Sequence, residues 1–181
     1  KEIDVIHNFI DVEKFISKET PCERNLLAKK DEKIVVHISN FRPLKRIMDV
    51  VYVFEQIRSK INAKLIMIGE GPEKPKAQRY CEKNNLSDKV IFLGNSSEVD
   101  DILCFSDLFL LLSEKESFGL SALEAMIHKV PVISTNVGGL PELNKNNYSG
   151  FLFDIGEINK MAKKSIEILS NKKLLKTYKN Q

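Results

Sequence analysis

Short apolar runs alternate with segments of helical periodicity along most of this chain, and this alternation restricts its fold more than any other feature. Runs of strand length lie at 33–39, 63–68, 89–93, 107–112, 131–135 and 150–153. The segments between them predict helices at 47–60, 73–84, 98–105, 119–129 and 158–170. Strands that alternate with helices predict a parallel sheet covered on both faces. We therefore expect an α/β, Rossmann-like, doubly wound domain.

Residues 1–31 do not share this alternation, and we expect them to form a linker with one short helix. Residues 32–181 then form a single domain, because 181 residues are enough for one well-buried core and short for two. The chain begins at Lys1 without a methionine, which suggests a fragment of a longer protein.

The loops that follow the strands are the places to search for a site. In doubly wound sheets the ligand lies beyond the carboxyl ends of the strands. The loops at that edge are 40–46, 69–72, 94–97, 113–118 and 136–141.

The most specific of these loops runs into a helix with the sequence SEKESFGLSALEAM, residues 113–126. A helix N-terminus offers free backbone N–H groups and a partial positive charge, which suit phosphate. Glu116 and Glu124 lie eight residues apart across this helix start, about 12 Å at the helical rise. They could be an exposed pair, but the aliphatic stretch 118–123 indicates partial burial, and a buried glutamate needs a partner. The pattern therefore favours a site for a nucleotide diphospho-sugar.

Two further loops carry polar signals with a plainer alternative. Arg42, Lys45 and Arg46 place three cations within five residues after the first strand, which suits a diphosphate clamp or a solvated loop equally. The turn Gly69-Glu70-Gly71-Pro72 lacks the third glycine of a dinucleotide fingerprint, so it does not indicate NAD binding. It is first of all a strand-to-helix turn, and it can also line the cleft.

The remaining loop signals are weaker. Gly94-Asn95 either lets a flat base approach the backbone or simply ends a strand. Gly138-Gly139 is either an anion-holding turn or a sharp reversal. The three histidines form no metal constellation, and His37, among apolar strand neighbours, is interpreted as a satisfied core residue.

Composition excludes several partners. A net charge of +3 gives no general indication of nucleic acid. Seven lysines against one acid in 160–181 could attract anionic lipid, but a solvated helix face is favoured, so we expect no peripheral membrane contact.

Three cysteines without a Cys-x-x-Cys pair indicate neither a disulfide framework nor a zinc site. With no membrane-length apolar run and no signal peptide visible, a cytoplasmic location is expected.

Taken together, these motifs resemble the retaining glycosyltransferases of family four, group 1. The pattern Glu116-(seven residues)-Glu124 is similar to that family's motif, and KVPVISTNVGGLPE at 129–142 is similar to its G-x-P-V-[IV]-[AG]-[ST]-x-x-G-G-[IL]-P-E segment. Residues 69–72 resemble its [VI]-G-[DE]-G-P turn, and VIHNFID at 5–11 resembles its interdomain linker. The resemblance implies the C-terminal, donor-binding half of a GT-B fold, without the N-terminal acceptor domain.

A narrower resemblance concerns the substrates. HISNFRPLKR and LLLSEKESFGL are similar to the members of the family that transfer N-acetylglucosamine to L-malate in the bacillithiol pathway. This implies UDP-N-acetylglucosamine as donor and L-malate as the acceptor, held by the absent domain. It also implies retention of configuration, no obligatory metal or other cofactor, and a fragment that binds donor without turnover.

The resemblance also implies roles for individual residues. Glu116 would bind the donor sugar's hydroxyls, Glu124 the ribose hydroxyls, and Lys45 the leaving diphosphate. The amides of 118–120 would meet the diphosphate, and Gly94 and its neighbours would face uracil. The remaining donor-site residues that the resemblance implies are Ser117, Phe118, Gly119, Leu120, Gly94, Asn95 and Gly69. Ser39-Asn40 stands where the family often has Gly-Arg, so Arg42 is the candidate for the guanidinium.

Two other classes compete with a transferase. A nucleotide-sugar epimerase would need an acid and a base flanking one carbon of the sugar, and no such pair is found. A non-catalytic nucleotide-sugar-binding module would not depend on the phosphate-clamping cations.

Overall fold

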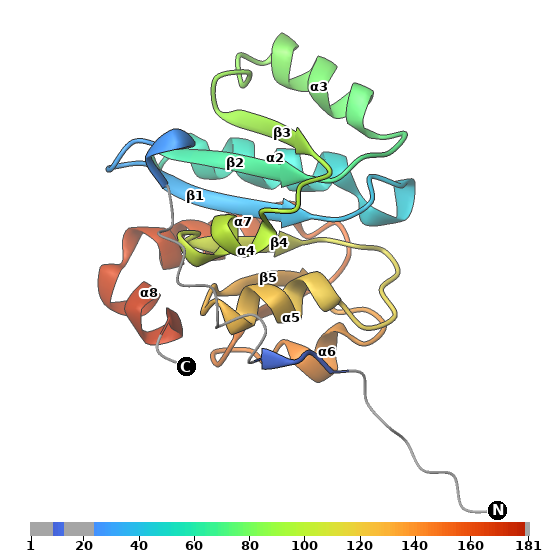
Figure 1. The fold of residues 1–181 in the computed structure, drawn as a ribbon, viewed down its shortest axis with the longest axis vertical. Helices are drawn as coiled ribbons and strands as arrows, with labels where there is room; N and C mark the ends of the chain where they lie inside the picture. Colours follow the sequence, from blue (N-terminus) through green and yellow to red (C-terminus); the bar gives the residue numbers. More distant parts are fainter. Residues whose placement is uncertain (1–8, 13–23, 180–181) are drawn as a thin grey trace, which may run out of the picture.

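A computed structural model describes residues 9–12 and 24–179 of the chain, and its centre is a six-stranded parallel sheet (Figure 1). The strand order is β3-β2-β1-β4-β5-β6. The strands are β1 (Lys33–Ile38), β2 (Ala63–Ile68), β3 (Val90–Gly94), β4 (Leu108–Leu111), β5 (Val132–Thr135) and β6 (Gly150–Phe153). Every strand predicted from the sequence is present within one or two residues at each end. The α/β, doubly wound class is therefore confirmed.

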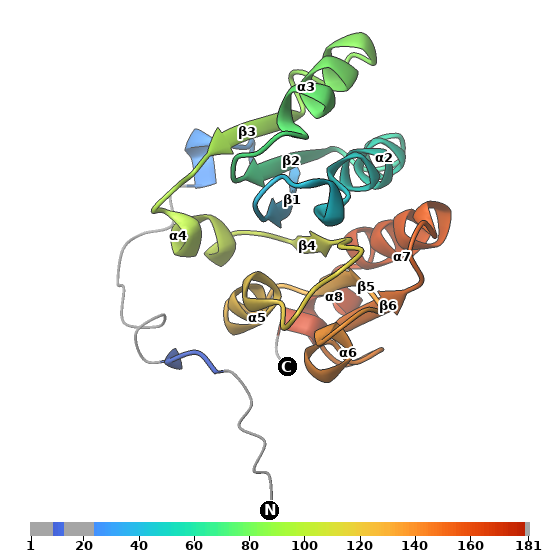
Figure 2. The ribbon, with the colours of Figure 1, turned by 90° about the vertical axis from the view of Figure 1, so that its right-hand side faces the viewer.

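Helices cover both faces of the sheet, as Figure 2 shows in side view. One face carries α2 (Ile47–Arg58), α3 (Lys74–Lys83), α7 (Ile158–Ser170) and α8 (Lys172–Lys179). The other carries α4 (Val99–Cys104), α5 (Leu120–Ile127) and α6 (Leu140–Leu143). Two short 3-10 turns, η1 (Arg24–Leu26) and η2 (Pro43–Lys45), precede and follow β1.

Alternation along each strand divides the core into two layers. On β1, Val35 belongs to the cluster under α2 and α7, whereas Ile34 and Val36 belong to the cluster under α4 and α5. Successive side chains of a strand point to opposite faces. A strand covered on both sides is therefore apolar at every position, which is why the sequence shows continuous apolar runs.

The sheet order reverses between β1 and β4, which pair directly in parallel register. In Figure 1 the strand arrows point to the edge where the loops after β1 and β4 lie. A crevice opens where strand order reverses in a doubly wound sheet. The topology thus brings the loops 39–46 and 112–119 together, although about 70 residues separate them in the chain.

The helix α8 has no counterpart in the sequence prediction. It begins after Asn171, whose side-chain Oδ1 accepts hydrogen bonds from the amides of Lys173 and Leu174 at 3.1 and 3.0 Å. Asparagine before a helix is a capping signal. The lysines of this segment obscured the pattern, because just two of the α8 side chains that the structure describes, Leu175 and Tyr178, are buried.

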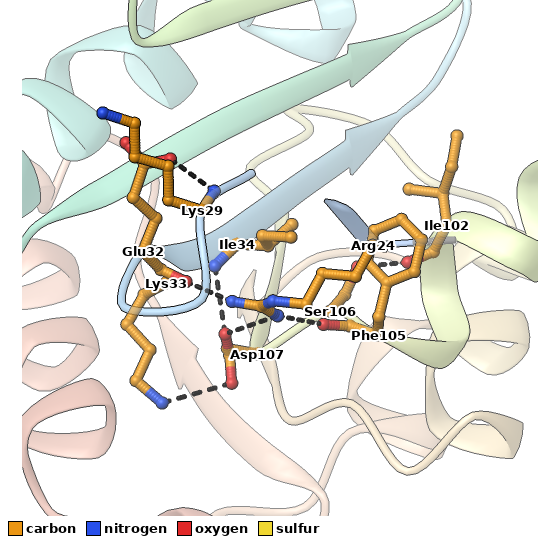
Figure 3. A network of polar contacts seen from close by, with 9 residues as sticks. All are labelled: Arg24, Lys29, Glu32, Lys33, Ile34, Ile102, Phe105, Ser106 and Asp107. Atoms are coloured by element: carbon orange, nitrogen blue, oxygen red, sulfur yellow. Dashed lines mark hydrogen bonds and ion pairs between the residues drawn. The ribbon is translucent and has the colours of Figure 1, made fainter. Parts of the chain in front are cut away.

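A polar network fixes the chain ahead of β1 to the amino-terminal edge of the sheet (Figure 3). The Arg24 guanidinium donates to the carbonyl oxygen of Phe105 at 3.0 Å and to that of Glu32. The Asp107 carboxylate lies 3.8 Å from Arg24 and 3.3 Å from the Lys33 ammonium. Residues 24–31, which the sequence analysis placed in the linker, therefore pack on the domain. The resemblance at 5–11 falls mainly outside the described residues.

Glu32 is a second charged group at this edge and is only 2% exposed. Its carboxylate accepts from the Lys89 ammonium at 2.7 Å and from the Lys29 amide at 2.9 Å, and Lys64 lies 3.8 Å away. Burial alone would raise the pKa of Glu32, but these donors together hold it below its usual value. The carboxylate is thus stabilised in its ionised form.

The cysteines depart from the expectation. Cys104 is disulfide-bonded, whereas Cys81 is a buried free thiol. A disulfide requires only that two Cβ atoms meet in space, which spacing in the sequence does not reveal. Within 9–12 and 24–179, no helix combines the length and the apolar character needed to cross a bilayer.

Candidate functional site

A cleft of about 730 Å³ lies at the carboxyl edge of the sheet, between the loops after β1, β2, β3 and β4. Nine of the eleven residues predicted for the site line it: Lys45, Gly69, Asn95, Glu116, Ser117, Phe118, Gly119, Leu120 and Glu124. Loops that are distant in sequence thus converge as the fold requires.

The other two predicted residues lie beside the cleft. Arg42 lines an adjoining hollow of about 530 Å³, which shares Asn40, Lys45, Glu116 and Ser117 with the cleft. Gly94 precedes the cleft residue Asn95, and its carbonyl accepts from the Gly69 amide at 2.8 Å. The structure therefore brings Arg42 near the same charges without placing it among the cleft-lining residues.

Lys45 and Glu116 form the central ion pair of the cleft. Lys45 Nζ lies 2.5 Å from Glu116 Oε2, and the two side chains are 14% and 13% exposed. The Ser113 hydroxyl donates to the same carboxylate oxygen at 3.3 Å. A charge pair this far out of water interacts much more strongly than an exposed one. The two side chains thereby hold each other in place where they line the cleft.

The loops that carry this pair are also joined through their backbones. The Glu114 amide donates to the Leu44 carbonyl oxygen at 2.7 Å. Arg46 donates to Asp49 at 2.6 Å and lies 3.8 Å from the Glu114 carboxylate. These contacts fix the loop after β1 against the loop after β4, so the ion pair is part of a preorganised site.

Gly138 and Gly139 pack against the backbone of the loop that carries Glu116. The Gly139 amide donates to the Glu116 carbonyl oxygen at 3.1 Å. Gly138 has φ +53°, and a Cβ there would lie 1.7 Å from that oxygen, while a Cβ on Gly139 would lie 2.5 Å from the Ser117 oxygen. The sequence allowed two interpretations of Gly138-Gly139, an anion-holding turn and a sharp reversal of the chain. The structure shows a turn whose glycines allow two backbones to touch.

The helix α5 begins inside the cleft. Gly119 precedes it with φ +94°, a left-handed conformation that favours glycine. The first amides of a helix have no intrahelical acceptor, and Phe118, Gly119 and Leu120 all line the cleft. The helix start therefore supplies N–H groups and positive potential where the sequence predicted an anion.

Glu124 stands one turn further along α5 and is half-buried. Burial raises its pKa, and the charge of Asp100 on α4 raises it further. Asp100 itself lies 3.4 Å from His128 Nε2. The two predicted carboxylates therefore differ: Glu116 is paired with a lysine, whereas Glu124 faces a second acid.

Sequence reasoning assigned no role to several residues that line the cleft, among them Ser39, Asn40, Ser96, Val99 and Ser121. Glu70 lines it too, as the sequence analysis allowed for the turn at 69–72. Ser39 and Asn40 had been noted as a departure from the Gly-Arg pattern without a role of their own. Glu70 lies in the glycine turn after β2, and a Cβ on Gly94 would come 2.9 Å from its Oε1. Its place between two glycines was the available signal.

Among residues 9–12 and 24–179, no group of three or more His, Cys, Asp or Glu side chains is arranged to hold a metal ion. The cations at the cleft and its adjoining hollow include the side chains of Lys45 and Arg42.

The fold and this cleft define a class: a Rossmann-like domain with a crevice at the point where strand order reverses, lined by a lysine and by the start of a helix. Residues 20–181 match the family model described as glycosyl transferases group 1, and the chain belongs to that family. The family predicted from the motifs is therefore confirmed, and an epimerase is not favoured.

Named relatives support this assignment. The chain is 41% identical over 175 residues to the N-acetyl-alpha-D-glucosaminyl L-malate synthase of Bacillus anthracis, covering 96% of this chain and 46% of that protein. It is 36% identical over 142 residues to the poly(ribitol-phosphate) alpha-N-acetylglucosaminyltransferase of Staphylococcus aureus (strain COL), covering 77% of this chain and 29% of that protein. The chain thus spans less than half the length of these relatives.

Solved structures show the same architecture. A variant of TarM from S. aureus, in complex with fondaparinux, alpha-GlcNAc-glycerol and UDP, matches with a TM-score of 0.84 and 30% identity, over 99% of this chain and 35% of that one. Anabaena Alr3699/HepE in complex with UDP and glucose matches with a TM-score of 0.87 and 22% identity, over 97% of this chain and 50% of that one. The second likeness concerns the fold alone.

Proposed function

We propose that this chain is the donor-binding part of a retaining glycosyltransferase that takes N-acetylglucosamine from UDP-N-acetylglucosamine. The observation that carries the proposal is the convergence of Lys45, Glu116, Glu124 and the start of α5 in one cleft. A cation, a helix N-terminus and two separated carboxylates suit the phosphates, the sugar and the ribose of one nucleotide sugar.

The proposed chemistry is electrostatic. When the bond between the sugar and the diphosphate breaks, negative charge grows on the leaving phosphate oxygens. Lys45, Arg42 and the amides of α5 offer fixed positive charge and N–H donors to that group. We propose that no metal ion or other cofactor is required, because these groups do the work that a divalent cation would otherwise do.

The carboxylates are proposed to hold the donor. Glu116 accepts hydrogen bonds from sugar hydroxyls while remaining next to Lys45, so binding of sugar and diphosphate is linked through one ion pair. Glu124 accepts from the ribose hydroxyls, and ordered donors there offset the burial that raises its pKa. Neither carboxylate is assigned as a general base.

The acceptor is proposed to be L-malate, supported by the name of the B. anthracis relative. Its binding to a further domain, the absence of turnover by this chain alone and the cytoplasmic location stay predictions.

Calorimetry with UDP and UDP-N-acetylglucosamine tests the donor site. Lys45→Ala and Glu124→Ala should each weaken UDP binding about tenfold or more, because each removes a charge-assisted contact. Lys160→Ala is the matched control, since Lys160 pairs with Glu157 on the exposed surface of α7. Unchanged UDP affinity in both site variants would contradict the proposed donor site.

A further inference from the structure

His37 is a buried titratable residue that the proposed chemistry does not use. It lies on β1, fully buried, with its ring 6.0 Å from that of Phe41. Its Nδ1 lies 2.8 Å from the carbonyl oxygen of Leu110 on β4, and its Nε2 lies 2.8 Å from the hydroxyl oxygen of Ser39. The ring therefore joins the two strands at the switch point to a residue of the cleft.

These two contacts determine which nitrogen carries the proton. A carbonyl oxygen can only accept, so Nδ1 must be the N–H donor to Leu110. Burial lowers the pKa of His37 to about 4, and the nearby charge of Lys45 acts in the same direction, so the ring is neutral near pH 7. A neutral ring has one N–H, and Nε2 is then an acceptor.

The direction of the second hydrogen bond follows. Because Nε2 accepts, the Ser39 hydroxyl must donate its only proton to His37. Ser39 is also one of the residues that line the cleft, as are Asn40, Lys45 and Glu116. A serine hydroxyl normally rotates to suit its partner, but here its proton is committed to the ring. Toward the cleft it can offer lone pairs only.

We propose that His37 is a positioning residue that holds Ser39 as a hydrogen-bond acceptor for the donor sugar. An acceptor fits a hydroxyl or an acetamido N–H of the sugar, and it disfavours a phosphate oxygen, which also carries only lone pairs. This inference rests on the proposed function and assigns the cleft position above β1 to the sugar.

Calorimetry separates the sugar contact from the nucleotide contacts. Ser39→Ala should weaken binding of UDP-N-acetylglucosamine about three- to tenfold, the worth of one neutral hydrogen bond, and leave UDP affinity within about twofold. Ser165→Ala makes the same chemical change at a buried serine of α7 that bonds only within its own helix, to Met161, and should alter neither affinity. An equal loss for both ligands, or no loss for either, would overturn the inference.

A second variant tests the role of the ring. His37→Phe should produce the same selective loss, and the double variant should bind no more weakly than Ser39→Ala alone, because both changes remove one interaction. Additive losses would contradict the assignment.

If His37→Phe does not fold, nitrogen NMR on the unmodified chain decides the point. The expected signal is a neutral ring with Nδ1–H at pH 7, perturbed by UDP-N-acetylglucosamine and not by UDP. A protonated ring or the Nε2–H form would refute the inference. No UDP binding at all would overturn the proposed function and this inference with it, whereas UDP binding with unchanged selectivity overturns this inference alone.

Discussion

The glycine turn beneath Glu116 offers the sharpest test of how the site is held. In Gly138→Ala the new Cβ would lie 1.7 Å from the Glu116 carbonyl oxygen, where real Cβ atoms stay beyond 3.0 Å. One of the two backbones must therefore move by more than about 1 Å, and either movement disrupts the contact through which the Gly138 turn holds the loop that carries Glu116.

Gly156→Ala is the matched control, because Gly156 also has a positive φ, +82°, and a Cβ there would meet nothing within 4 Å. It measures the conformational cost alone, about 1 to 2 kcal/mol for a left-handed alanine. Gly138→Ala adds the cost of overpacking, about 1 to 3 kcal/mol, so its total should reach about 2 to 5 kcal/mol.

The assays are urea denaturation for stability and calorimetry for UDP affinity. Gly156→Ala should bind UDP as the unmodified chain does. Gly138→Ala should lose at least about tenfold, because a displacement near 1 Å costs a preorganised site heavily. Equal stability and equal affinity in the two variants would show that the turn does not position Glu116.

Three further predictions concern stability and reactivity. Asn144→Ala should lower the free energy of unfolding by about 2 to 4 kcal/mol in denaturation. The buried side-chain amide of Asn144 donates to the Val132 carbonyl, the Ser134 hydroxyl and the Phe151 carbonyl, and the variant leaves these groups without that donor. A loss under about 1 kcal/mol would mean that water replaces the amide. Glu32 should make the chain acid-labile: its pKa is lowered by folding, so its contribution is present above its ordinary value of 4.5 and is lost as pH falls through the folded pKa. As pH falls below 4.5, the free energy of unfolding should decrease less steeply for Glu32→Gln than for the unmodified chain. Parallel curves for the two proteins would contradict this. Cys81 should resist thiol reagents at pH 7 to 8 while the chain is folded, since burial raises its pKa to about 11; modification at the rate of a free thiol would count against its burial.

The fold could be predicted from the sequence because the signal is local and repeated. Each buried strand needs apolar side chains on both faces, and each helix needs them on one, so hydrophobic spacing alone separates the two. The prediction failed at α8, whose short apolar stripe is interrupted by lysines and whose clearest signal is the single cap at Asn171. It also gave no indication of the disulfide at Cys104, because spacing in the sequence does not reveal which two side chains meet in space.

The site could be predicted as a set of loops but not as a set of contacts. The Lys45–Glu116 pair joins residues 71 positions apart, and it exists because β1 and β4 are neighbours. Strand order cannot be read from hydrophobic spacing. The role of Gly138 stayed open for the same reason, since the oxygen that it accommodates belongs to a different loop.

The Ser39-Asn40 departure shows how structure changes the meaning of a motif. Against the family pattern it looked like the loss of an arginine, with Arg42 as the substitute. In the structure Asn40 lines both the cleft and the adjoining hollow, whereas Arg42 lines only the hollow. Lys45 is then the cation that reaches both spaces, and the position once assigned to a missing guanidinium carries neutral groups instead. Under the proposed function this edge of the cleft contacts the sugar of the donor, because Ser39, whose proton is given to His37, can accept from a hydroxyl group but cannot donate to a phosphate oxygen.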